Sequence, residues 1–151
     1  MSPAHPFSWI FAVTSLWASC FAGCSSPSTT PPPAACVNDV KTDCSLLYDP
    51  PIYQTIFDNI LHRTCAIGMG SCHTSDVAMG GLVFEDADVA YALLLGQMGA
   101  RQRVVPTDPA CSFLVVRLES TDPNYVMPKG SRLSDEAICD VVQWIAQGAA
   151  R

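Results

Sequence analysis

Hydrophobic side chains recur at intervals of three and four residues in four stretches of the chain, which is the spacing of one face of an α-helix. This pattern predicts helices over about 52–64, 86–95, 109–119 and 135–147. Other apolar runs, at 82–84 and 104–105, are too short to form a sheet. The pattern therefore predicts an all-α domain of about four helices joined by long loops.

Residues with helix-capping side chains lie at the expected boundaries. Asp86 or Asp88 can cap the second helix, where they form an acidic helix start with Glu85. Asp108-Pro109 combines a cap with a proline at the first helical position, and Ser134 can cap the last helix. Because the loops between these helices are long, we expect disulfides, a cofactor or both to organise them.

All 22 charged side chains, 8 basic and 14 acidic, lie after residue 38. The formal net charge is −6, so nothing in the chain is suited to binding nucleic acid. No apolar run after residue 38 approaches the roughly 20 residues that span a membrane. The 151 residues therefore indicate one charged domain behind an uncharged front segment.

The front segment contains a hydrophobic run over 9–22, of the length found in export signals. The run ends at Ala22-Gly23-Cys24, which resembles the bacterial lipoprotein signal, in which the cysteine is lipidated and becomes the new N-terminus. Residues 25–35 are rich in proline, serine and threonine and are expected to form an extended spacer. We expect a signal peptide over 1–23, a tether over 24–35 and a folded domain over 36–151.

The lipoprotein resemblance implies export and a membrane anchor at Cys24 in the cell envelope. The outer membrane, with the domain facing the periplasm, is the expected location. The alternative is an ordinary secretory peptide that is cut near Gly23 and leaves Cys24 as a spare thiol, and a cut before Cys20 fits less well.

Six cysteines remain in the exported domain, and an even number in an oxidising compartment indicates disulfides or cofactor attachment. They are Cys36, Cys44, Cys65, Cys72, Cys111 and Cys139. Sequence alone does not fix their pairing. We expect a local disulfide between Cys36 and Cys44, and one between Cys111 and Cys139 that joins two helices. Cys65 and Cys72 stand apart, because His73 directly follows the second of them.

The order Cys65, Cys72-His73 and Met127-Pro128 resembles the small c-type cytochromes. In that family a first helix leads into C-x-x-C-H, a Met-Pro follows much later, and the last helix packs across the first. The resemblance covers about residues 52–149 and departs from the family in spacing, because six residues separate the cysteines instead of two.

This resemblance implies a monohaem electron-transfer protein and not an enzyme. Cys65 and Cys72 would hold haem c through thioether bonds, and His73 and Met127 would be the axial ligands of the iron. It also implies that the N- and C-terminal helices pack together. Because the net charge is negative, we expect a redox partner with a basic surface.

The six-residue spacing keeps other interpretations open. In one, Cys65 and Cys72 form a disulfide, and a haemless helical domain has a binding or structural role in the envelope. His73 is then a surface residue and Met127 fills the core. In another, Cys65, Cys72 and His73 bind zinc, although no fourth ligand lies nearby in the sequence.

Three other methionines, Met69, Met79 and Met98, are rivals of Met127 as the axial ligand. Met127 is preferred because the resemblance implies a Met-Pro in the loop before the last helix.

Three further basic or titratable residues are expected to lie outside the four proposed haem-binding positions. His62 is expected on the polar side of the first helix, in contact with solvent. Arg101 and Arg103 either pair with haem propionates or are exposed loop charges. No nucleophile, metalloprotease or phosphate-loop motif supports hydrolase or transferase activity.

Overall fold

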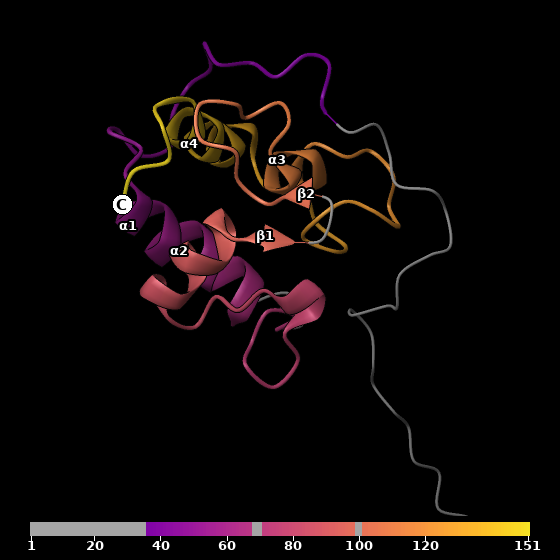
Figure 1. Ribbon diagram of the computed structural model, residues 1–151. Helices are drawn as coiled ribbons and strands as arrows, with labels where there is room; N and C mark the ends of the chain where they lie inside the picture. Colours follow the sequence, from indigo (N-terminus) through magenta and orange to yellow (C-terminus); the bar gives the residue numbers. More distant parts are fainter. Residues whose placement is uncertain (1–35, 68–70, 99–100) are drawn as a thin grey trace, which may run out of the picture.

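The computed structural model describes residues 36–67, 71–98 and 101–151 (Figure 1). The expected signal peptide over 1–23, the lipidation site Cys24 and the tether over 24–35 lie outside these residues. Among the residues described, no helix is both long enough and apolar enough to cross a membrane.

The first predicted helix is continuous but changes type along its length. Its first turn is α1 (Tyr53–Ile56), which passes directly into the π-helix η1 (Phe57–Ala66). Ile56, Ile60 and Leu61, which lie on the buried face of this helix, are at most 2% exposed, whereas Ile52 before it is 52% exposed. The helix extends slightly beyond its predicted end, and Cys65 therefore lies in its last turn.

The second helix, α2 (Ala87–Leu95), confirms the prediction of a helix that starts at the acidic cluster. The Asp86 carboxylate accepts hydrogen bonds from the backbone N–H groups of Asp88 and Val89. Asp86 is therefore the cap, and Asp88 belongs to the first turn.

A two-residue strand, β1 (Gln97–Met98), follows α2 and pairs antiparallel with β2 (Arg101–Gln102). This hairpin was not predicted, because strands of two residues carry no periodic pattern. The runs at 82–84 and 104–105 form no strand, as expected.

The third helix, α3 (Phe113–Leu118), begins four residues later than predicted. A helix from the predicted start would need the Leu114 N–H to donate to the Ala110 carbonyl. The Leu114 N–H instead donates to the Arg103 carbonyl, and the Ala110 carbonyl accepts from the Val37 N–H, both at 2.9 Å. Tertiary hydrogen bonds thus replace the first helical ones, and the predicted start was wrong.

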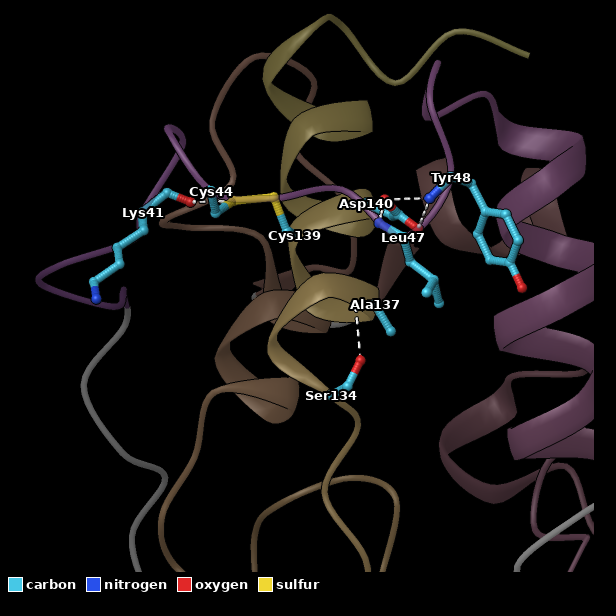
Figure 2. The surroundings of a disulfide bond; sticks show 8 residues. All are labelled: Lys41, Cys44, Leu47, Tyr48, Ser134, Ala137, Cys139 and Asp140. Atoms are coloured by element: carbon cyan, nitrogen blue, oxygen red, sulfur yellow. Dashed lines mark hydrogen bonds between the residues drawn. A yellow bond between two sulfur atoms is a disulfide. The ribbon is translucent and has the colours of Figure 1, made fainter.

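The last helix, α4 (Asp135–Ala146), matches its prediction closely. The Ser134 hydroxyl caps it by accepting a hydrogen bond from the Ala137 N–H (Figure 2). Gly148 follows with a φ of 102°, a conformation that glycine adopts without steric cost.

Aromatic side chains hold the first and last helices together. The Tyr53 ring of α1 lies 5.4 Å from Trp144 of α4 and 5.0 Å from Tyr91 of α2, measured between ring centroids. The Tyr53 hydroxyl donates to the Ala87 carbonyl at 2.7 Å. The structure confirms a mostly helical fold in which the N- and C-terminal helices are in contact.

Residues 36–48, the entry segment, run beside α3 and α4 before the first helix (Figure 1). Its cysteines form two disulfides, Cys36 with Cys111 and Cys44 with Cys139 (Figure 2). The four cysteines expected in disulfides are therefore paired, but the expected pairs, Cys36–Cys44 and Cys111–Cys139, were wrong.

Hydrogen bonds at both ends of the entry segment explain this pairing. Val37 is bonded to the loop before α3, and the N–H groups of Leu47 and Tyr48 donate to the Asp140 carboxylate of α4 (Figure 2). Because the segment is held along the helices, Cys36 meets Cys111 in the turn before α3 and Cys44 meets Cys139 in α4, so neither pairs with its neighbour in sequence. The two disulfides indicate an extracytoplasmic domain.

Candidate functional site

A small pocket lies where the end of η1 meets the loop between α3 and α4. It is lined by Thr64, Cys65, Cys72, His73, Met127, Pro128 and Lys129. The structure therefore brings together the four residues that the sequence singled out as haem-binding candidates, although 54 positions separate His73 from Met127.

A backbone hydrogen bond closes the loop between the two cysteines. The His73 N–H donates to the Cys65 carbonyl at 3.1 Å. In a C-x-x-C-H sequence the first cysteine and the histidine are four residues apart, and a helical turn would join the same two groups. The four extra residues of this chain are thus accommodated without losing that connection.

The His73 imidazole is oriented by the chain that follows it. Its Nδ1 lies 3.2 Å from the Leu82 carbonyl, and since a carbonyl only accepts, Nδ1 carries the proton. The Phe84 N–H donates to the His73 carbonyl at 2.8 Å, and the Phe84 ring packs edge-on against the imidazole, with 5.4 Å between centroids. In the neutral imidazole this leaves the lone pair on Nε2.

Burial keeps His73 neutral. It lowers the pKa of the imidazole, and the charges of Arg117 and Arg103 act in the same direction, against the carbonyls of Leu82 and Met79. A neutral imidazole with a lone pair on one nitrogen is the form that binds a metal.

Cys65 carries a free thiol in the structure. Burial raises its pKa to about 12, so the sulfur is protonated at neutral pH. The disulfide between Cys65 and Cys72, which the haemless interpretation expected, is therefore not formed. Since Cys65 lies in the last turn of η1, its position is set by the helix and needs no crosslink.

Met127 reaches the pocket from the loop after α3. Its N–H donates to the Arg117 carbonyl at 3.0 Å, and Pro128 behind it is buried. Among the rival methionines, Met79 lies in the short helix η2 (Met79–Gly81) and does not line the pocket, Met98 lies in β1, and Met69 is outside the described residues.

His62 was expected to contact only solvent, and the structure corrects this. Its Nδ1 donates to the Phe84 carbonyl at 2.7 Å, because the helix places its side chain against the 82–84 segment. This segment is thereby bonded to both His62 and His73.

Neither arginine is the exposed loop charge that was one expectation. Arg103 is only 8% exposed and donates to the carbonyls of Leu93, Gly80 and Gly81. Arg101 is partly buried, donates to the Tyr125 hydroxyl at 3.2 Å and lies 5.0 Å above the Phe113 ring.

Sequence reasoning missed the roles of Arg103 and of the Leu82 carbonyl. Both act through main-chain oxygens, which leave no signal in side-chain patterns. The one sequence signal for this turn is the pair of adjacent glycines, Gly80 and Gly81, which have positive φ angles of 64° and 65° in the structure.

The side chains suit haem c, but the space between them is small. Two cysteines, a histidine and a methionine are the residue types that hold a c-type haem, but the Cys72 sulfur is disulfide-bonded in this structure and is not a free thiol. The enclosed space of about 20 Å³ would hold roughly one water molecule. Haem would therefore fit only if residues 127–129 moved away from Cys65, Cys72 and His73.

A zinc site is not supported. The described part of the chain contains no group of three or more histidine, cysteine, aspartate or glutamate residues that could hold a metal ion.

Comparison with known proteins gives one match. Residues 70–130 match the family model described as Planctomycete cytochrome C. No curated protein and no solved structure gave a match. The matched region includes Cys72, His73 and Met127 and begins after Cys65, so it supports a cytochrome c domain over residues 70–130.

Proposed function

We propose that the protein is an extracytoplasmic, membrane-anchored cytochrome c that passes single electrons and is not itself an enzyme. The observation that carries this proposal is the pocket that Cys65, Cys72, His73 and Met127 share. The match of residues 70–130 to a cytochrome c family supports it independently.

Each residue has a specific role in this proposal. Cys65 and Cys72 would hold haem c through thioether bonds, and His73 and Met127 would bind its iron. The bound haem would supply a carrier for one electron. The chain's own contribution is to keep His73 neutral through burial and to keep its lone pair on Nε2 through the Leu82 carbonyl at Nδ1. A thioether ligand and an apolar shell favour Fe(II) and raise the reduction potential.

The location and the partner belong to the same proposal. Cleavage before Cys24 and its lipidation would anchor the domain in the outer membrane, facing the periplasm, and the two disulfides agree with an oxidising compartment. The formal net charge of −6 favours a redox partner protein with a basic surface.

One observation favours an alternative function, a haemless helical lipoprotein domain with a binding or structural role in the envelope. The pocket has room for only about one water molecule, so the domain is closed without a cofactor. Two disulfides and the contact between the first and last helices would stabilise such a domain.

Expression of the full chain in a host with working cytochrome c maturation separates the two functions. We expect a coloured protein with a Soret band, haem that stays bound on a denaturing gel, and a mature mass that includes haem and lipid. A folded, colourless protein whose mass lacks haem would overturn the haem proposal and support the alternative.

Cysteine substitutions provide the control. Cys65→Ser and Cys72→Ser together are expected to abolish covalent haem. Cys36→Ser with Cys111→Ser removes a disulfide outside the pocket and is expected to lower stability while the remaining folded protein still carries haem.

A further inference from the structure

Arg103 is a buried cation whose hydrogen bonds go only to main-chain oxygens. Its Nη1 donates to the Leu93 carbonyl at 2.7 Å, and its Nη2 donates to the carbonyls of Gly80 at 2.8 Å and Gly81 at 3.2 Å. No carboxylate among the described residues forms an ion pair with it. Burying a cation costs free energy. We therefore expect the hydrogen bonds of Arg103 to have a structural role, which is to fix a particular arrangement of the chain.

The backbone on both sides of the Arg103 side chain is anchored to helices. The Arg103 carbonyl accepts from Leu114 of α3, and the next N–H, that of Val104, donates to Leu94 of α2 at 3.0 Å. The backbone of Arg103 is therefore fixed in position, and its guanidinium group extends from there to the Gly80-Gly81 turn.

That turn leads directly into the carbonyl that orients His73. Leu82 follows Gly81, and its carbonyl oxygen is the partner of His73 Nδ1. The far end of the same segment is held by His62, which donates to the Phe84 carbonyl. Arg103 and His62 thus fix the two ends of residues 80–84, and the oxygen that orients His73 lies between them.

We propose that Arg103 is a positioning residue for His73: by holding the Gly80 and Gly81 carbonyls, it keeps the Leu82 carbonyl on Nδ1 and so keeps the proton on Nδ1 and the lone pair on Nε2. The value of this arrangement for iron binding rests on the proposed function. The arrangement itself does not require haem and can be measured without it.

The reason is the tautomerism of imidazole. A neutral histidine carries one proton, which can reside on either ring nitrogen, and the hydrogen bond at one nitrogen decides between them. If residues 80–82 shift, the Leu82 carbonyl leaves Nδ1 and the proton is free to move to Nε2. A protonated Nε2 has no lone pair for a metal.

The test is the tautomer ratio of His73, read from ¹⁵N chemical shifts of the full chain exported in a host that lacks cytochrome maturation. Wild-type protein is expected to show mainly the Nδ1–H form. In Arg103→Gln the ratio of Nδ1–H to Nε2–H is expected to fall roughly fivefold, the factor that corresponds to one neutral hydrogen bond. Arg103→Lys, which keeps the charge and one donor group but not the fork, should lie between them and covers the case that Arg103→Gln does not fold.

Ser112→Ala is the matched control for stability. Ser112 is fully buried and its hydroxyl bonds the backbone of Val105 and Asp108, and not residues 80–84. It should lower the stability of the protein without changing the His73 tautomer. An Arg103 variant that folds with an unchanged tautomer ratio, or a Ser112→Ala protein with the same change in ratio, would overturn the proposal.

The haem-loaded protein gives a second reading that separates this inference from the proposed function. If the protein carries haem, Arg103→Lys is expected to raise its reduction potential, because a histidine whose Nδ1–H loses its carbonyl acceptor is a less basic ligand, while Ser112→Ala leaves the potential unchanged. If the wild-type protein carries no haem, the proposed function fails, but the tautomer measurement still decides whether Arg103 positions His73.

Discussion

The N–H of His73 donates to the carbonyl of Cys65 at 3.1 Å, although the two residues are eight positions apart in the sequence. In a helical turn this bond joins residues four positions apart, which is the separation of the first cysteine and the histidine in C-x-x-C-H. The chain therefore keeps the local connection of the usual motif and carries four additional residues between its ends.

Deletion of residues 67–70 tests whether the additional residues are an insertion into an otherwise ordinary motif. It leaves Ala66 and Ser71 between the cysteines, so the sequence becomes C-A-S-C-H. Because the His73–Cys65 bond can then form within one helical turn, we expect a folded protein with a higher fraction of covalently bound haem. The measurement is the ratio of Soret absorbance to protein in host cells with cytochrome maturation.

Replacement of residues 67–70 by four glycines is the control for this deletion, since it changes the same residues and keeps the six-residue spacing. It should load haem like the unaltered chain. A shortened protein with an unchanged circular dichroism spectrum and less haem would contradict the prediction.

The approximate positions of the helices and four of the residues that line the pocket could be predicted from the sequence, for a physical reason. The helices depend on apolar periodicity and on caps such as Asp86 and Ser134, which act within a few residues. The pocket depends on residue types, because Cys72-His73 and Met127-Pro128 are recognisable as a pattern wherever the chain places them.

The structural features that could not be predicted from the sequence depend on contacts with backbone groups that are distant along the chain. The disulfide partners follow from the path of the entry segment along α4, which is set by Asp140. The late start of α3 follows from the diverted carbonyl of Ala110, and the burial of Arg103 follows from the main-chain carbonyls that accept its hydrogen bonds. None of these acceptors has a side-chain signature.

The raised pKa of Cys65 predicts an unreactive thiol in the haem-free protein. A pKa of about 12, compared with 9.0 for an ordinary cysteine, leaves about a thousandfold less thiolate at neutral pH. Iodoacetamide at pH 8 is therefore expected to label Cys65 slowly in the folded protein and rapidly after unfolding, with mass spectrometry as the measurement.

An Ile67→Cys variant gives the comparison for this labelling. Ile67 is two residues from Cys65 and 64% exposed, so a thiol there should react quickly in the folded protein. Equally fast labelling of Cys65 would show that it is not buried. Failure to label it after unfolding without a reductant would show a disulfide, as the haemless interpretation first expected.

Met127→Ala tests the distal ligand. Met127 is only half-buried, so we expect the variant to fold, but loss of the thioether should change the visible spectrum of the haem protein and lower its reduction potential. Met79→Ala is the matched control, because Met79 lies in η2 and does not line the pocket. An unchanged spectrum and potential in Met127→Ala would rule out Met127 as a ligand.

The hydrogen bonds and the pKa of Asp140 predict how the stability of the protein depends on the entry segment and on pH. Its buried carboxylate accepts from the N–H groups of Leu47 and Tyr48, beside the Cys44–Cys139 disulfide (Figure 2). Asp140→Ala leaves both N–H groups without this partner and is expected to cost about 2–4 kcal/mol in the free energy of unfolding, measured with urea at pH 7. Asp140→Asn should cost less, because its amide oxygen can accept from the same two groups.

The pKa of Asp140 gives the sign of the pH effect. Burial raises it above 3.8, against the hydrogen bonds from Tyr48 and Leu47, so the folded protein binds this proton more tightly than the unfolded chain. The contribution of this group to stability is therefore largest below the unfolded pKa and falls as the pH rises through the folded pKa. The difference in unfolding free energy between wild type and Asp140→Asn should accordingly change in favour of Asn as the pH rises above about 4. If this free-energy difference stays constant with pH, or changes in favour of the wild type, the prediction is wrong. The hydrogen bonds from the two backbone N–H groups would then balance or outweigh the effect of burial on the pKa of Asp140.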